Sequence, residues 1–333
     1  MRAVLFHLFQ SKMSQKIRIG VLGCAAIAER SMIPAILDLS EYFELIAVAS
    51  RTPEKANYFS NLFNCEGVVG YDQLIAREDI DALYIPLPSG LHHEWIPKAL
   101  KSGKHVYAEK SIAMDFNICE QMVLEAKKNH VALMEGFMFQ YHSQHIEIQD
   151  LIQSGAIGEL RHFSASFGFP SLPEGNFRYD TNLGGGALYD AGAYPVRAAF
   201  MFLGNNLRVK GASLMRSPNG ASQYGSAYLH GSNGVGAAIS FGFDNFYQCN
   251  YTFWGSKGKL TADRAFTPRP DAKPLIILEN NEGTNIIEAD ADNHFEKALL
   301  EFYSIIVNTT LREKHFSEIT QQSLALHEIN TIG

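Results

Sequence analysis

A short glycine- and alanine-rich segment at residues 20–28 has the spacing of a phosphate-binding turn. It follows a β-rich run and is close to Gly-x-Gly-x-x-Gly/Ala, a pattern that binds dinucleotides. Gly23 would form the tight turn and Ala28 the close packing of helix on strand, while Ala25 stands where glycine is usual. The small alanine methyl still lets a pyrophosphate approach the backbone. The motif alone would equally fit a plain turn, but its place between a first strand and a first helix favours a nicotinamide dinucleotide, and hence hydride transfer.

The end of the next β-rich run, residues 44–50, decides which dinucleotide fits. An NAD site usually carries Asp or Glu here, which accepts hydrogen bonds from the ribose hydroxyls. This chain has Ser50-Arg51, with Lys55 one helical turn later. Arginine pairs with a 2′-phosphate and serine can donate to it, whereas a carboxylate would repel it. We therefore expect NADP(H); the alternative is a solvated arginine that begins a surface helix.

Two other segments carry residue types that hold charge or move protons. Glu109-Lys110 ends one expected strand, at the carboxyl edge where open α/β sheets bind ligands. Asp190 and Tyr194 are four residues apart, so on a helix they would project from one face. Gly192 and Pro195 are poor residues for a helix interior, which predicts a distorted helix. Such residues fit a functional site, although a buried tyrosine beside a packing turn would also explain them.

Alternating strand and helix patterns over residues 16–136 must position these groups. The expected strands are 17–22, 44–50, 82–87, 105–109 and 131–135, and the expected helices are 34–39, 52–63, 71–77, 92–102 and 117–130. This alternation predicts an α/β fold, a doubly wound parallel Rossmann sheet with helices on both faces. Residues 1–15 are expected to be a disordered leader, or to precede a true start at Met13.

Residues 137–333 have the pattern of an α+β domain. In 161–169, Phe163, Ala165, Phe167 and Phe169 share one face, as in a half-buried strand. Further strands are expected near 234–243, 246–255, 258–263 and 274–280, and helices after 184–186 and near 292–309 and 317–330. We expect an open, mostly antiparallel sheet whose uncovered face joins copies into a homodimer or homotetramer.

The composition is that of an ordinary globular protein, long enough at 333 residues for two domains. A net charge of −7 argues against nucleic acid or an anionic membrane as a partner. No apolar run reaches the length of a membrane span, and the four cysteines form no CxxC pair. His142 and His145 have metal-like spacing but no accompanying ligand set. We therefore expect a cytoplasmic protein with reduced thiols and no metal.

Two motifs resemble those of the Gfo/Idh/MocA oxidoreductases, and the resemblance covers nearly the whole chain after Lys16. The family motif Glu-Lys-Pro, whose lysine is catalytic, matches Glu109-Lys110-Ser111, with serine in place of proline. The family segment Gly-Gly-Gly-x-Leu-x-Asp-x-Gly-x-His/Tyr matches residues 184–194 and ends here in Tyr194. The resemblance implies an NADP-binding Rossmann domain over 16–136 and a substrate-binding and oligomerisation domain over 137–333.

The resemblance further implies hydride transfer to or from the carbonyl of a sugar or sugar nucleotide. We expect Tyr194 to donate or accept the proton, Lys110 to be its electrostatic partner, and Asp190 to anchor a substrate hydroxyl. A phenol of pKa ~10 is a poor acid or base at neutral pH until a neighbouring cation stabilises its phenolate. Lys110 would also polarise the carbonyl oxygen.

Further contacts are expected from the same motifs and strand ends. Substrate contacts are expected from Lys110, Phe137, Arg178, Asp190 and Tyr194. Cofactor contacts are expected from Gly23, Cys24, Ala25, Ala26, Ile27, Ser50, Arg51, Lys55, Pro86, Leu87, Pro88, His92, Glu109 and Lys110. His92 is expected either to line the nicotinamide end of the cleft or to lie on the surface at a helix start.

Tyr194 followed by Pro-Val-Arg is similar to the branch that contains NDP-hexose 3-ketoreductases, glucose–fructose oxidoreductase and dihydrodiol dehydrogenases. Many relatives carry Arg where this chain has Gln140. One alternative is a dihydrodiol or aldose dehydrogenase, which would use the same site in reverse. Another is a non-catalytic, dinucleotide-sensing regulatory protein, which would have no need of both Lys110 and Tyr194.

Overall fold

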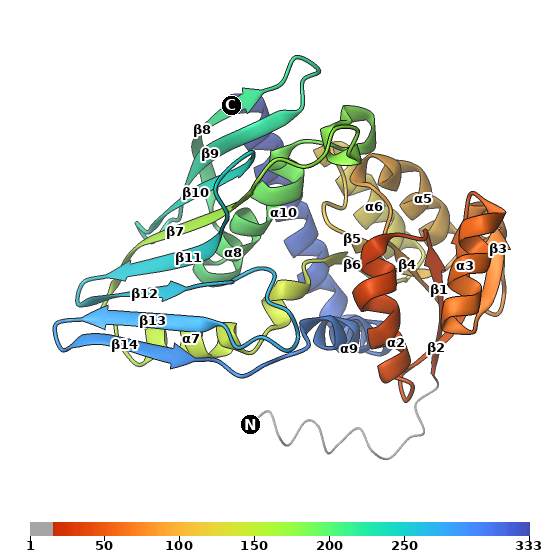
Figure 1. The fold of residues 1–333 in the computed structure, drawn as a ribbon, viewed down its shortest axis with the longest axis horizontal. Helices are drawn as coiled ribbons and strands as arrows, with labels where there is room; N and C mark the ends of the chain where they lie inside the picture. Colours follow the sequence, from red (N-terminus) through yellow and green to blue (C-terminus); the bar gives the residue numbers. More distant parts are fainter. Residues whose placement is uncertain (1–15) are drawn as a thin grey trace.

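The computed structural model describes residues 16–333, so the expected leader at 1–15 lies outside it. The first half of the chain forms a six-stranded parallel sheet of order β3-β2-β1-β4-β5-β6 (Figure 1). Its strands are β1 (Ile17–Leu22), β2 (Phe43–Ser50), β3 (Glu66–Val69), β4 (Ala82–Ile85), β5 (His105–Glu109) and β6 (Leu133–Gly136). Its helices are η1 (Ala28–Met32), α2 (Ile33–Asp38), α3 (Pro53–Phe63), α4 (Tyr71–Ile75), α5 (Ser89–Lys101) and α6 (Phe116–Lys128).

This sheet confirms the predicted Rossmann fold and its five expected strands. The strand order reverses between β1 and β4, and the carboxyl ends of these strands form the crevice in which such folds bind ligands. The prediction missed β3, which has only four residues and pairs with β2 from residue 66 to 69. It also missed the start of the first helix, because the chain turns helical soon after Gly23 and passes through the π-helical turn η1 before α2.

The second half forms an eight-stranded sheet of order β14-β13-β12-β11-β7-β10-β9-β8. Its strands are β7 (Leu160–Phe169), β8 (Arg208–Arg216), β9 (Ser222–His230), β10 (Gly236–Phe243), β11 (Gln248–Gly255), β12 (Gly258–Ala262), β13 (Leu275–Asn280) and β14 (Gly283–Glu288). All neighbours are antiparallel except β7 and β10, which confirms a mostly antiparallel sheet.

Short helical turns and four α-helices accompany this sheet. They are η2 (Met138–Tyr141), α7 (Gln144–Gln153), η3 (Phe177–Tyr179), η4 (Thr181–Leu183), η5 (Leu188–Gly192), α8 (Ala193–Leu203), α9 (His294–Val307), η6 (Thr309–Leu311) and α10 (Arg312–Ile332). One face of β7 packs its buried Phe163, Ala165 and Phe167 beneath α8. The alternate residues Ser164 and Ser166 lie on the opposite face, as the period of the strand predicts.

The two C-terminal helices do not belong to the second domain alone. Tyr303 of α9 packs edge-on against Phe43 of β2, and Phe302 packs against Tyr107 of β5. Ile319 of α10 is buried in the same core as α5 and α6, and Figure 1 shows α10 running between the two sheets. The expected boundary at 137 therefore separates the sheets but not the packing units, because the helices that cover part of the first sheet come from the end of the chain.

No helix among residues 16–333 is long and apolar enough to cross a membrane. The four cysteines are unpaired.

Candidate active site

The turn after β1 has the geometry that a bound pyrophosphate requires. Gly23 has φ +126°, and a Cβ added there would lie 2.7 Å from a methyl carbon of Leu87. Only glycine fits this position, as the motif predicted. Ala28 is fully buried against the sheet, while Ala26 at the start of the helix is exposed. The first amides of this helix therefore face the carboxyl edge of the sheet without an acceptor inside the helix.

Two cations stand beside this turn at the end of β2. Arg51 and Lys55 are exposed, and within residues 16–333 neither forms an ion pair. The Cys24 thiol lies 3.7 Å from the carbonyl oxygen of Lys55, which brings the turn and the start of α3 together. Burial raises the pKa of Tyr71, and the neighbouring Arg51 guanidinium opposes that rise, so Arg51 lies close to this hydroxyl. The arrangement can hold a doubly charged phosphate.

His92 occupies neither of its two expected positions. The side chain is completely buried, with its ring nitrogens 2.9 Å from the carbonyl oxygen of Leu87 and 3.0 Å from that of Ser111. Burial lowers the pKa of His92 to about 4, so at neutral pH only one of its two ring nitrogens carries a proton and can donate. His92 therefore packs between the segments after β4 and β5, and its side chain has no exposed surface to offer a ligand.

Lys110, Asp190 and Arg178 meet across the boundary between the two sheets. The Lys110 ammonium lies 2.6 Å from Asp190 Oδ1 and 3.1 Å from the Asp190 carbonyl oxygen. Arg178 Nε donates to Asp190 Oδ2 at 2.7 Å. Burial would raise the pKa of Asp190, but the two cations together lower it. Asp190 is thus an ionised carboxylate with both oxygens engaged, so here it holds two cations rather than standing free as the expected hydroxyl anchor.

Tyr194 lies beside this group in the first turn of α8. Its ring is enclosed by Phe137, Phe139, Phe167 and Phe266 at centroid distances of 5.7, 5.7, 5.1 and 5.8 Å. The Lys110 ammonium lies over the ring, 5.3 Å from its centroid. The π-helical turn η5 directly before α8 confirms the predicted distortion.

Burial and the carboxylates of Glu109 and Asp190 raise the pKa of Tyr194 well above 10. The predicted lowering of the Tyr194 pKa is therefore wrong for this arrangement, because burial of the phenol is the largest effect on it. Phe137 was expected to contact substrate, but its side chain is only 1% exposed and packs edge-on against the Tyr194 ring.

Comparison with known proteins shows which family this chain belongs to. Residues 17–137 match the family model described as an oxidoreductase family with an NAD-binding Rossmann fold, and residues 145–261 match the model of the GFO/IDH/MocA C-terminal domain. The chain belongs to the Gfo/Idh/MocA family. It is an oxidoreductase, as the motifs predicted.

The chain is similar to several known proteins, two of them over most of its length. A dTDP-3,4-didehydro-2,6-dideoxy-α-D-glucose 3-reductase of Saccharopolyspora spinosa is 44% identical over 291 residues, 87% of each chain. A 3-ketoreductase of Actinomadura kijaniata, solved with NADP and TDP-benzene as a variant with one tyrosine replaced, has a TM-score of 0.92 and 38% identity over 96% of this chain and 98% of its own. A trans-1,2-dihydrobenzene-1,2-diol dehydrogenase of Xenopus laevis is 34% identical over 161 residues, 47% of this chain and 48% of its own.

Two residues beside the family lysine segment were not among the predicted site residues. Glu135, at the end of β6, accepts a hydrogen bond of 2.8 Å from the Ile112 amide, and burial raises the pKa of Glu135 to about 7. Ser111 donates to the carbonyl oxygen of Tyr189 at 3.0 Å, and the Lys110–Ser111 peptide is cis. The sequence showed Ser111 only as a departure from the family motif, and no spacing rule links Glu135 to residue 112.

Arg197 contacts Gln140, which stands where many relatives carry arginine. It lies one turn after Tyr194 and donates to Gln140 Oε1 at 2.9 and 3.0 Å and to Glu318 at 2.5 Å. Its side chain is 7% exposed. The guanidinium is therefore buried, and residues from η2 and α10 hold it in place.

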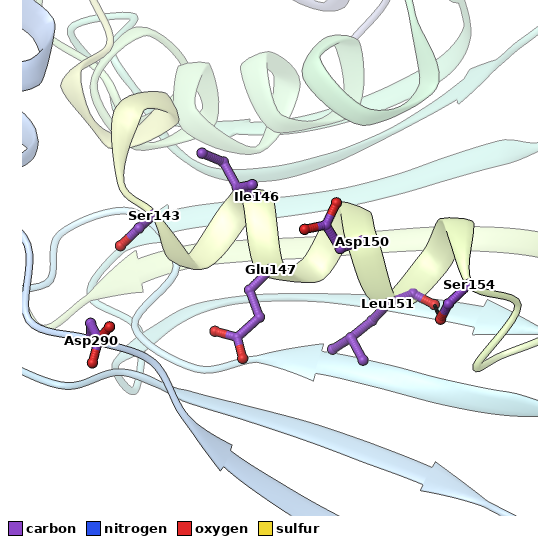
Figure 2. A pocket seen from close by; sticks show the side chains of 7 residues that line it. All are labelled: Ser143, Ile146, Glu147, Asp150, Leu151, Ser154 and Asp290. Carbon is purple, nitrogen blue, oxygen red and sulfur yellow. Dashed lines mark hydrogen bonds between the residues drawn. The ribbon is translucent and has the colours of Figure 1, made fainter. Parts of the chain in front are cut away.

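Other candidate sites lie apart from these residues. A surface hollow along α7 is lined mainly by polar and acidic side chains, and none of the expected site residues faces it (Figure 2). His142, His145 and His294 form a buried cluster, in which burial lowers the pKa of His145 to about 3 and that of His294 to about 4. Among residues 16–333 no group of three or more possible ligands is arranged for a metal ion.

Proposed function

We propose that this chain is an NADP(H)-dependent 3-ketoreductase that acts on a nucleoside-diphosphate sugar, with Lys110 and Tyr194 as its catalytic pair. The contact of Lys110 with Asp190 and with the face of Tyr194, beside the cofactor turn, carries this proposal. The relatives that are similar over most of the chain are named as reductases of a dTDP-sugar at C3. A tyrosine and a lysine are the residues replaced in solved variants of one of them.

The cofactor would be held by residues that fit its charges and shape. Gly23 makes the tight turn after β1, and the amides of residues 25–27 would bind the pyrophosphate. Arg51 and Lys55 would pair with the 2′-phosphate, with Ser50 beside them. When bound, NADPH supplies the hydride.

The remaining chemistry belongs to side chains of this protein. Burial raises the pKa of Tyr194, so the phenol is protonated at neutral pH. It would donate its proton to the alkoxide that forms on the sugar, because an alkoxide is a stronger base than a phenolate. The Lys110 ammonium supplies positive charge at the developing oxyanion. Asp190 fixes the ammonium in place through a short ion pair, and Arg178 holds the other oxygen of Asp190.

The test is the turnover of Tyr194→Phe and Lys110→Ala with NADPH and a 3-keto dTDP-sugar. Each variant should lose at least about 100-fold in kcat and still bind NADPH with near wild-type affinity. Full turnover by both would refute the pair. A wild-type protein that binds NADPH tightly but reduces no ketone and oxidises no diol or aldose would be a sensor, and turnover of diols or aldoses alone would favour the dehydrogenase reading.

We also propose that the uncovered face of the second sheet joins two or more copies of the chain. Along the middle strands this face carries small side chains, Ser166, Ser226 and Ser240, which lie opposite one another in register. Exposed Trp254 and Tyr228 flank them. A flat sheet of this composition is suited to pack against a second copy of itself. The unpaired thiols support a cytoplasmic location.

A further inference from the structure

Ser111 ties the lysine segment to the segment that carries Asp190 and Tyr194. Its side chain is 1% exposed, and its hydroxyl donates to the carbonyl oxygen of Tyr189 at 3.0 Å. Tyr189 is the residue before Asp190 in η5. Two successive residues after β5 therefore contact two successive residues of η5. The Lys110 ammonium contacts Asp190, and the Ser111 hydroxyl contacts Tyr189.

The backbone around Ser111 is held on its other side by the Rossmann domain. The carbonyl oxygen of Ser111 faces His92 Nδ1 at 3.0 Å, and the next amide, that of Ile112, donates to Glu135 at 2.8 Å. The segment is thus fixed to the first domain by buried side chains. The hydrogen bond from the Ser111 hydroxyl to Tyr189 then links this fixed segment to the second domain.

The residue type at 111 decides whether this bond can exist. The family motif has proline here, and proline has no side-chain donor. The serine hydroxyl in this chain instead donates to a backbone carbonyl of the second domain, and both groups are buried. In this chain the proline ring, which restricts the backbone, is therefore absent. A hydrogen bond between the two segments of the site stands in its place.

We propose that Ser111 is a positioning residue, which sets the place of the Lys110 ammonium relative to Tyr194 by fixing the distance between their two segments. This inference rests on the proposed function, because it assigns Ser111 a part in the same reaction. Without the hydroxyl, Lys110 keeps its ion pair, but η5 and the lysine segment are free to shift against each other. Small displacements of a catalytic group reduce the chemical step strongly.

The experiment compares Ser111→Cys and Ser111→Ala with the wild type. The thiol is a weaker donor of similar shape and the alanine has none, so kcat should fall in the order Ser, Cys, Ala, by about tenfold at alanine, with the KM for NADPH unchanged. Ser304→Ala is the matched control, since it deletes a hydroxyl that donates to the Leu300 carbonyl oxygen at 2.8 Å, within α9.

The outcomes separate this inference from the proposed function. Ser111→Ala with wild-type kcat, in a protein that Lys110→Ala inactivates, would overturn the positioning role and leave the proposed function intact. A loss of kcat in Ser111→Ala no larger than that in Ser304→Ala would also overturn it. Equal turnover by Lys110→Ala and wild type would refute the proposed function itself.

Discussion

Arg51 is an exposed guanidinium with no carboxylate partner among the described residues, beside the turn that would hold a dinucleotide. We predict that Arg51→Ala weakens NADPH binding by about 10- to 100-fold, the loss of a charge-assisted contact, and changes NADH binding by less than about twofold. Fluorescence titration of both cofactors measures this. Arg269→Ala, which removes an exposed arginine paired with Asp271, is the control. Equal weakening of both cofactors would mean that Arg51 does not read the 2′-phosphate.

Glu135 predicts a pH dependence of stability. Its folded-state pKa of about 7 exceeds its ordinary value of 4.5 because the carboxyl is buried. Relative to glutamine, the carboxyl therefore stabilises the fold most below pH 4.5, and this contribution is lost as the pH rises through 7. From pH 5 to pH 8, the free energy of unfolding of Glu135→Gln should rise by about 2 kcal/mol relative to that of the wild type.

Urea denaturation at the two pH values measures the effect of Glu135→Gln. The exposed Glu282→Gln should show no such change relative to the wild type. A constant difference between Glu135→Gln and wild type across this range would contradict the raised pKa.

The residues predicted from the sequence are those that lie in contiguous motifs. Lys110 and Tyr194 could be named because each stands at a fixed place within a recognisable run. Glu135, Ser111 and Arg197 act through partners 23, 78 and 57 positions away in the chain, at Ile112, Tyr189 and Gln140. No local spacing reports such contacts. His92 and Phe137 are buried, which contradicts their predicted contacts, and this burial is likewise set by the packing of distant elements.

At the scale of elements, α10 belongs to both halves of the molecule. It packs on α6 and β6 of the first domain and on α8 and β8 of the second. Phe316 and Ile319 are 4% and 2% exposed in the core that α5 and α6 share. Helix α10 therefore completes a core built mainly by residues from the first half of the chain.

We predict that truncation after residue 311 abolishes stable folding and NADPH binding, although every proposed cofactor residue remains. Burying each large apolar side chain is worth about 1.5–3 kcal/mol, and α10 contributes several to a total stability of about 5–15 kcal/mol. Circular dichroism and nucleotide titration of the truncated chain measure this. Deletion of residues 332–333 alone is the control, because Ile332 is 54% exposed. A soluble, NADPH-binding chain 1–311 would show that α10 is dispensable.

Most elements followed from local patterns, and the missed ones have weak patterns. β9 and β14 carry Gly, Ser, Asn and Thr among few apolar residues, and their conformation depends on pairing with β10 and β13. Strand propensity is largely a property of the neighbouring strands, so isolated segments of this kind do not reveal it. The parallel pairing of β7 with β10 also depends on the whole sheet.

At the scale of the molecule, the uncovered sheet face predicts an oligomer. Ser240 is exposed near the middle of this face, opposite Ser166 and Ser226. We predict that the wild type has at least twice the mass of one chain in solution and that Ser240→Arg dissociates it, because an arginine cannot be accommodated in a flat, close-packed interface. Light scattering after size-exclusion chromatography measures the mass.

Leu124→Arg is the control for the oligomer, since Leu124 is 64% exposed on α6 of the other domain. A wild-type monomer at micromolar concentration would refute the interface. A Ser240→Arg variant that keeps the wild-type mass would show that the interface lies on another face of the molecule.

The position of α9 and α10 on the first sheet has a consequence for biosynthesis. The ribosome releases β1 to β6 first, yet the helices that bury Phe43 and Tyr107 are translated last. Until then the nascent N-terminal half exposes apolar surface, which invites aggregation and chaperone binding. Translation that stalls before residue 294 should leave a polypeptide with an intact nucleotide motif and no native domain. Chaperones would therefore have to protect this enzyme until its final helices emerge.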